Sequence, residues 1–199
     1  MQADRALSEL QRTFGSHPQW PQYQNGRLMN QPRYSRDTIA SAALASQHFF
    51  DAVGSRGVGN NQQAGELGNF FKKITAINVH IYDLNAEIPQ LELLQLLTGG
   101  FLTIKIDNRE FVYDMPLHLC AAGAGMGGLV STADTTTPNE ILNFEPVGAP
   151  QGYPIEVPYA PRQNISADIN WAGAAAAPTN DLVAQLVLYG PEMHERASG

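Results

Sequence analysis

Residues 165–189 read ISADINWAGAAAAPTNDLVAQLVLY and contain two runs in which apolar and polar side chains alternate. The alternating apolar positions are Ile165, Ala167, Ile169 and Trp171 in the first run and Leu182, Ala184, Leu186 and Leu188 in the second. Side chains on a strand point to opposite faces in turn, so this pattern predicts two strands that each bury one face. The segment Ala174–Pro178 between the two runs has the composition of a turn.

Similar alternation occurs earlier in the chain. It predicts strands at residues 74–82 and 155–157 and a hairpin made of residues 101–106 and 111–113, with its turn at Asp107-Asn108-Arg109. Short strands separated by turns, without helices alternating between them, indicate an all-β protein. We therefore predict a β-sandwich or barrel rather than a parallel α/β sheet.

Residues 4–14 and 89–97 each predict a short helix. Each segment has a stripe of apolar residues spaced by three or four: Leu7, Leu10 and Phe14 in the first and Leu91, Leu94 and Leu97 in the second. Asn85 is the predicted cap of the second helix, and Gly15 and Gly99-Gly100 are the predicted ends of the two helices.

Two other segments are less regular. In residues 38–53 the alanines favour a helix, whereas the Thr38-Ile39 start and Phe49-Phe50 favour a strand, so both interpretations stay open. Residues 121–151 are rich in glycine, threonine, alanine and proline and predict a long loop with one short strand near 141–144. A loop of this length is typical of a functional or interface segment.

The composition is that of a chain with few charges. Charged residues make up 16% of the 199 residues and hydrophobic residues 43%, so most of the surface is neutral. The length suits one domain with an appendage, and we place the division between residues 1–36 and residues 37–199. A neutral surface lacks the charge repulsion that keeps monomers apart, which favours a protein that assembles.

The first residues, the apolar runs and the cysteine content indicate where in the cell the chain is expected. The polar start Met1-Gln2-Ala3-Asp4-Arg5 has no apolar run after it, so we expect no secretory signal and synthesis in the cytoplasm. The longest apolar run, Leu91–Leu97, is too short to span a bilayer. Cys120 is the single cysteine, so no disulfide can form within the chain.

Residues 1–36 are predicted to be a helix followed by an extended basic arm. Between residues 10 and 36 there are four arginines and no acid, although the whole chain has a net charge of −7. Arginine and aromatic side chains dominate interface hot spots. The candidate subunit-interface residues are therefore Trp20, Tyr23, Arg27, Arg33, Tyr34 and Arg36.

Two alternatives for this arm are a disordered tail and a segment that grips single-stranded nucleic acid by stacking and charge. Binding of nucleic acid by residues 37–199 is disfavoured, because the acidic excess opposes contact with phosphates.

Several local patterns suggest chemistry but lack the context that the chemistry needs. Gly123–Gly128 matches G-x-G-x-x-G, yet the residues after it are a poor helix and no βαβ unit surrounds it. His118 and Cys120 would share the face of a strand, but nothing near them would lower the pKa of the thiol, so we expect a buried, inert thiol.

Metal ligation has equally weak support. The five histidines never have the spacing of a local metal site. His80 and His118 could still meet across a sheet, where two structural histidines are favoured over two metal ligands. Residues 134–139 could offer oxygen ligands to calcium, without the spacing of a calcium loop. We predict no catalytic residue, no cofactor and no metal site, and a protein that is not an enzyme.

Three stretches resemble the single jelly-roll structural proteins of bacteriophages and other viruses. They are the Gly/Asn-rich loop before Phe70-Phe71-Lys72-Lys73-Ile74, the run from Leu96 to Phe111 and the ending from Leu182 to Gly190. The resemblance covers residues 38–190 as a pattern of features. It implies an antiparallel sandwich of two four-stranded sheets, with an N-terminal arm that reaches neighbouring subunits.

The same resemblance implies a structural virion protein, either a capsid subunit or a capsid-associated one. Its expected partners are copies of itself and other virion structural proteins rather than small molecules, and its expected location is the virion. Many repeated contacts allow each one to be weak. Removing residues 1–36 is expected to abolish assembly and to leave a folded body.

Two other functions fit an all-β chain. A lectin-like sandwich would bind glycans through the loops at residues 54–68 and 121–151. A small β-barrel enzyme of cupin type would need a histidine cluster that the sequence does not supply.

Overall fold

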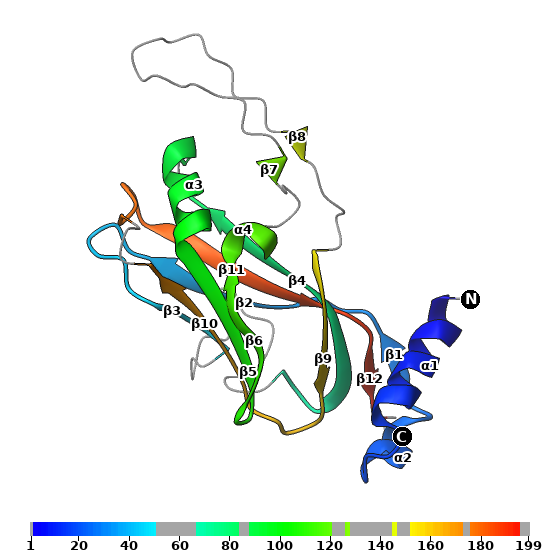
Figure 1. The fold of residues 1–199 in the computed structure, drawn as a ribbon. Helices are drawn as coiled ribbons and strands as arrows, with labels where there is room; N and C mark the ends of the chain where they lie inside the picture. The colour runs from blue at the N-terminus through cyan, green and yellow to red at the C-terminus, as the bar shows by residue number, and fades with distance from the viewer. Residues whose placement is uncertain are drawn as a thin grey trace.

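The chain forms two packed β-sheets with helices at opposite ends (Figure 1). The computed structural model describes residues 2–50, 67–83, 88–120, 126–127, 145–146, 152–172 and 176–195. The predicted cap at Asn85, the predicted strand near 141–144 and most of the predicted loops at 54–68 and 121–151 lie outside the described residues.

The first sheet contains six strands. They are β1 (Arg27–Met29), β2 (Arg33–Ile39), β4 (Phe70–Tyr82), β9 (Tyr153–Tyr159), β11 (Leu182–Tyr189) and β12 (Glu192–His194). β4 pairs with β11 and β12 along one edge and with β9 along the other. Because β2 pairs with β11 and β1 with β12, the six strands act as four, two of which are interrupted.

The second sheet contains four strands in the order β3-β10-β5-β6. They are β3 (Gln47–Phe49), β10 (Ile165–Trp171), β5 (Gly100–Ile106) and β6 (Arg109–Pro116). A separate pair joins β7 (Met126–Gly127) to β8 (Glu145–Pro146). Every described strand pair is antiparallel.

The order of the strands is that of a jelly roll. With β1–β2 and β11–β12 each taken as one strand, the strands of the first sheet follow the chain order 1-8-3-6 and those of the second 2-7-4-5. Consecutive strands therefore alternate between the sheets, except at the β5–β6 hairpin. This arrangement confirms the predicted all-β, jelly-roll-like antiparallel sandwich.

The main core lies between the inner faces of the two sheets. The alternating residues from the predicted strands are buried there: Ile165, Ala167, Ile169, Leu182, Ala184, Leu186 and Leu188. Trp171, at the end of β10, is only partly buried. The period-two pattern therefore predicted the inner faces of β10 and β11 correctly.

Four helices flank the sheets. α1 (Gln2–Phe14) and α2 (Trp20–Tyr23) lie at one end, and α3 (Gln90–Gly99) and α4 (Leu117–Cys120) at the other (Figure 1). The predicted helix at residues 4–14 is confirmed as α1, with Leu10 and Phe14 buried.

The predicted helix at 89–97 is confirmed as α3, but of its predicted stripe Leu91, Leu94 and Leu97 only Leu97 is fully buried. Leu96 and Leu97 are buried and Leu93 packs beside them, whereas Leu91 is 67% exposed. Leucines at five of seven positions allow two stripes with helical spacing, so periodicity could not choose between them.

Within residues 38–53, the described part, residues 38–50, contains strand and no helix. β2 ends at Ile39, and Gln47–Phe49 form β3 at the edge of the other sheet. The backbone N–H of His48 donates to Asp37 Oδ2 at 2.9 Å, which ties this corner together.

The boundary drawn between residues 36 and 37 falls inside β2. Residues 33–36 are paired with residues 185–188 of β11, so their interpretation as an arm outside the domain is wrong. The sequence hid this strand because its inward positions include Arg33 and Ser35, which are polar. Removing residues 1–36 would take away part of a sheet, so a deletion that tests the appendage has to end before β1, at residue 24.

Candidate functional site

The structure divides the six candidate interface residues into two groups. Trp20, Tyr23 and Arg33 are buried within this chain. Arg27 and Arg36 are exposed and Tyr34 is half-buried. The prediction made no such division, because an unaligned sequence does not show which aromatic residues a chain buries against itself.

Trp20 and Tyr23 belong to a second hydrophobic cluster, which holds α1 and α2 on the outer side of the first sheet. Phe71 of β4 lies at its centre. The Phe71 ring centroid is 4.9 Å from that of Phe14, 5.3 Å from that of Trp20 and 5.0 Å from that of Tyr23. Phe70, the preceding residue, faces the main core instead, so β4 is covered on both faces.

The polar atoms of the two buried aromatic side chains, Trp20 and Tyr23, also form hydrogen bonds. Trp20 Nε1 donates to Gln11 Oε1 at 3.1 Å, and the Tyr23 hydroxyl donates to Asn69 Oδ1 at 3.0 Å. Burial raises the pKa of the Tyr23 hydroxyl. These contacts attach the N-terminal helices to their own sandwich, which contradicts an arm that is extended over its whole length.

Arg33 forms a buried ionic cluster with Glu192 and Lys72. Its Nε and Nη2 donate to Glu192 Oε2 at 3.0 Å and Oε1 at 2.6 Å. Lys72 Nζ lies 3.5 Å from Glu192 Oε2 and donates to the carbonyl oxygens of Gln31 at 3.0 Å and Gly190 at 2.7 Å. Gln31 lies in the interruption between β1 and β2 and Gly190 in that between β11 and β12, so Lys72 satisfies carbonyl groups that the interruptions release from the sheet.

Gly190 is required at its interruption. Its φ is +140°, and a Cβ atom there would come within 1.9 Å of the Lys73 carbonyl oxygen. The kink at Gly190-Pro191 therefore needs a glycine, and it turns β12 towards the N-terminal helices.

The environment of the cluster shifts two pKa values. Burial lowers the pKa of the Lys72 ammonium to about 8, against the attraction of Glu192. Burial alone would raise the pKa of the Glu192 carboxyl, but the hydrogen bond from Arg33 and the charge of Lys72 outweigh it and hold that pKa below its usual range. His194 Nε2 lies 2.9 Å from Glu192 Oε1 and links the cluster to the surface.

The low pKa of Lys72 predicts a pH dependence. The unfolded chain keeps this proton up to about pH 10, whereas the folded chain releases it near pH 8. Between these values the unfolded state binds more protons, so the free energy of unfolding gains a contribution that rises with pH. Urea unfolding at several pH values should show this rise in the wild type relative to Lys72→Met, and parallel profiles would contradict it.

Sequence analysis missed this cluster because its members are far apart in the chain. Arg33 and Glu192 are separated by 159 residues. The one local signal was Lys72-Lys73 within the apolar run from Phe70 to Ile74, since a lysine in a buried strand needs a partner.

Arg36 organises a patch on the outer face of the first sheet. Its guanidinium carbon lies 5.5 Å from the ring centroid of Tyr34 and 5.9 Å from that of Tyr82. Arg36 Nε donates to Gln185 Oε1 at 3.0 Å, and the Tyr82 hydroxyl donates to the same oxygen at 3.3 Å. We call Tyr34, Arg36, Tyr82 and Gln185 the Arg36 patch.

Cys120 and His118 do not share a strand face, because they lie on the helical turn α4. Cys120 is buried and its thiol donates to the Leu117 carbonyl at 3.5 Å, whereas His118 is exposed. Burial raises the pKa of the Cys120 thiol to about 12. His80, in contrast, lies on β4, and burial lowers its pKa.

The thiol of Cys120 is therefore expected to resist alkylation. Iodoacetamide at pH 8 should label the folded protein far more slowly than the protein unfolded in urea, because the reagent attacks the thiolate. Mass spectrometry of timed samples measures both rates, and equal rates would contradict the buried thiol.

Within the described residues there is no group of three or more His, Cys, Asp or Glu placed to hold a metal ion. The glycine motif at 123–128, apart from β7, and the residues 134–139 lie outside them. None of the described helices is long and apolar enough to cross a bilayer.

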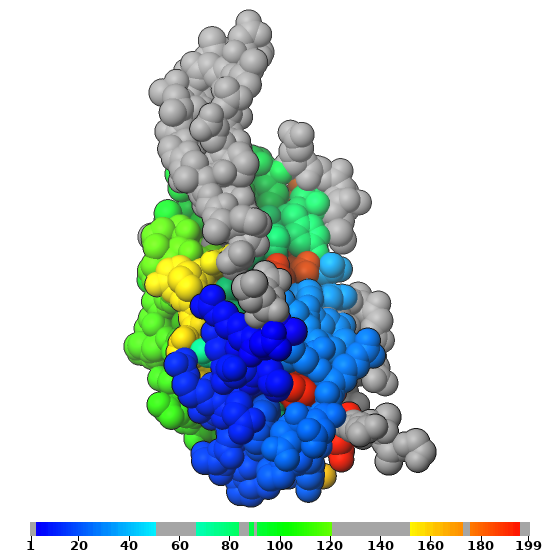
Figure 2. Space-filling view, turned by 90° about the vertical axis from the view of Figure 1, so that its right-hand side faces the viewer, coloured from blue at the N-terminus to red at the C-terminus, as the bar shows by residue number. Residues whose placement is uncertain are grey.

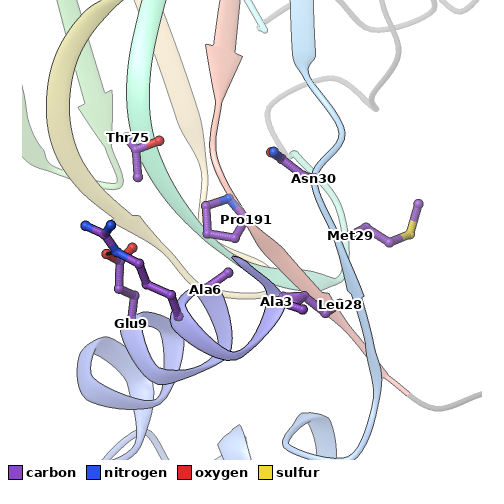
Figure 3. Close-up of a pocket in the computed structure, with 9 residues that line it drawn as sticks. Ala3, Ala6, Glu9, Leu28, Met29, Asn30, Thr75 and Pro191 are labelled. Atoms are coloured by element: carbon purple, nitrogen blue, oxygen red, sulfur yellow. Dashed lines mark ion pairs between the residues drawn. The ribbon is translucent and has the colours of Figure 1, made fainter. Parts of the chain in front are cut away.

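An open groove of about 490 Å³ lies between α1, β1 and the kink of the first sheet (Figure 3). Ala3, Ala6, Leu28, Met29 and Pro191 form the apolar part of its lining, and Arg5, Glu9, Asn30 and Thr75 form the polar part. The helix that forms one wall is itself on the surface, beside the residues of β1 and β2 (Figure 2).

Comparison of the chain with protein-family models, with curated proteins and with solved structures found no match.

Proposed function

We propose that this chain is a structural virion protein, a capsid or capsid-associated subunit that packs on copies of itself and on other shell proteins. The observation that carries the proposal is the interleaved strand order of the two sheets, since the double-sheet jelly roll is a fold of viral capsid domains. A fold can host many functions, so the surface has to support the proposal independently.

The Arg36 patch supplies the first support from the surface. Tyrosine and arginine are the residue types that dominate interface energies. Arg36 is already ordered by its contacts with Tyr34, Tyr82 and Gln185, so a partner would lose little side-chain entropy on binding there.

Further support comes from two edge strands, β9 of the first sheet and β6 of the second. β9 carries Pro154 and Pro158, which have no N–H to offer, and β6 carries Asp114 at a φ of 45° and ends at Pro116. Such edges resist the addition of another strand. Contacts between subunits through faces and ends suit a closed shell better than growth of a continuous sheet.

Of the original candidates, Arg27, Tyr34 and Arg36 stay as interface residues in this proposal. Trp20, Tyr23 and Arg33 have the different role of holding the N-terminal segment on its own subunit.

Light scattering after size-exclusion chromatography tests the proposal on the full chain. We expect the average mass to rise with protein concentration, and electron microscopy should show regular particles or rings. A protein that stays monomeric over the whole range of concentrations would contradict it.

Arg36→Glu is expected to weaken this association by about tenfold or more, because it removes the central cation of the patch. Lys105→Glu is a matched control: it makes the same charge change on the second sheet, where Lys105 pairs with Glu110 at 2.9 Å. If both variants associate like the wild type, the patch is not an interface.

A further inference from the structure

The two ends of the sandwich have different surfaces. The α1–β1 end has the groove of about 490 Å³, whose lining is partly apolar and partly polar (Figure 3), a size that accommodates several side chains. The opposite end, with α3 and α4, has exposed apolar side chains: Leu91 is 67% exposed and Leu119 is 47% exposed. Two of the four large hydrophobic side chains that are exposed among the described residues therefore lie at this end.

The two ends also differ in charge. At the α3–α4 end, Asp83, Glu92 and Asp181 are acidic, and the described residues 39–46, 82–83, 88–98, 117–120 and 176–182 contain no lysine or arginine. An aspartate is ionised at neutral pH, and two hydrogen bonds from Ser41 lower the pKa of the Asp181 carboxyl further.

The α1–β1 end has an excess of cations. Arg5, Arg12, Arg27 and Arg162 are exposed there, against Asp4, Glu9 and Glu195. Glu9 already pairs with Arg5 at 3.6 Å, and Arg27 adjoins Leu28 in the wall of the groove. Opposite charges at the two ends attract copies that approach in one orientation and repel those in the other.

We propose that the α3–α4 end of one copy seats its Leu91 side chain in the α1–β1 groove of the next copy, head to tail. This inference rests on the proposed function and names the partner and the contact surfaces. Because the two surfaces are different, the contact is heterologous, and it repeats from copy to copy until a ring or shell closes.

Variants on each side of the contact test the proposal. Leu91→Asp removes the apolar side chain and adds a charge, and Ala6→Trp fills the groove. Since a bulky residue could lift α1 from the sheet, Met29→Glu provides a second groove variant. Each is expected to weaken self-association at least about tenfold, the effect of losing one buried leucine.

A matched control is Tyr113→Asp. Tyr113 lies on β6 and is 70% exposed, close to the value for Leu91, but it belongs to neither end. The variant is expected to associate like the wild type.

Mixing the variants gives the sharpest result. Leu91→Asp keeps an intact groove and Met29→Glu keeps an intact Leu91, so an equimolar mixture can form one good contact and no more. Light scattering should show a larger average mass in the mixture than in either variant alone at the same total concentration.

The outcomes separate the two proposals. If the wild type associates and the Leu91 and groove variants associate equally well, or if their mixture has no larger average mass than each variant alone, the head-to-tail contact is wrong while the assembly function stands. If the wild type itself is monomeric at every concentration, both fail.

Discussion

Replacing Glu192 with glutamine is expected to lower the free energy of unfolding by about 3–5 kcal/mol. The carboxylate of Glu192 is the acceptor for the fork of Arg33 and lies beside the Lys72 ammonium, and all three side chains are buried. Without its negative charge, two cations stay in a region from which water is largely excluded. Urea denaturation followed by circular dichroism measures the change.

An exposed Lys–Glu pair supplies the control. Lys105 Nζ lies 2.9 Å from Glu110 Oε1, and the two side chains are 40% and 42% exposed. Glu110→Gln should therefore cost no more than about 1 kcal/mol. Equal effects of the two variants would show that burial does not strengthen the dependence on Glu192.

The effect of Glu192→Gln on the free energy of unfolding should also depend on pH in the acid range. The pKa of Glu192 is lower in the folded chain than in the unfolded chain. The ionised carboxylate therefore contributes its full stabilisation above the pKa of an ordinary glutamate, about 4.3. This stabilisation is lost as the pH falls from that value through the lower pKa of Glu192 in the folded chain. The difference in unfolding free energy between the wild type and Glu192→Gln should thus shrink in acid. A difference that stays constant down to pH 3 would contradict the assignment.

The ionic cluster also marks the limit of prediction from the sequence. Alternation of apolar and polar residues predicted the bounds and the buried faces of β10 and β11 correctly, because one face of each strand packs in the core. β2 breaks that rule, since Arg33 and Ser35 occupy its inner face. An inward arginine is stable there only through Glu192, which the local sequence cannot indicate.

The N-terminal segment was misjudged for a related reason. Its prolines and arginines suggested an arm that leaves the domain, and its aromatic residues suggested contacts with another chain. Trp20 and Tyr23 instead face Phe71, a residue whose neighbour Phe70 faces the main core. Two consecutive phenylalanines in a strand indicate that both faces of the strand are covered, and this signal could have located the docking surface of the helices.

Replacing Phe71 with alanine is expected to lower the free energy of unfolding by about 3–5 kcal/mol, the usual cost of removing a buried aromatic ring. Its ring contacts Phe14, Trp20 and Tyr23, so the loss should fall first on α1 and α2. Hydrogen exchange should become faster in α1, and the fluorescence of Trp20 should shift to longer wavelengths. Trp171 lies in the second sheet and should be unaffected, so a Trp171→Phe background isolates the signal of Trp20.

Tyr113→Ala is the control for the loss of an aromatic ring, because Tyr113 is 70% exposed and should change the stability by only about 0.5 kcal/mol. If Phe71→Ala left the emission of Trp20 and the exchange of α1 unchanged, the helices would be held without the central ring, and the aromatic cluster would not be what anchors them. The expected result is instead that the helices detach before the sandwich unfolds, since the core between the two sheets does not include Phe71. The wall of the groove at Ala3 and Ala6 would be lost with them, so the same variant should also weaken association between copies.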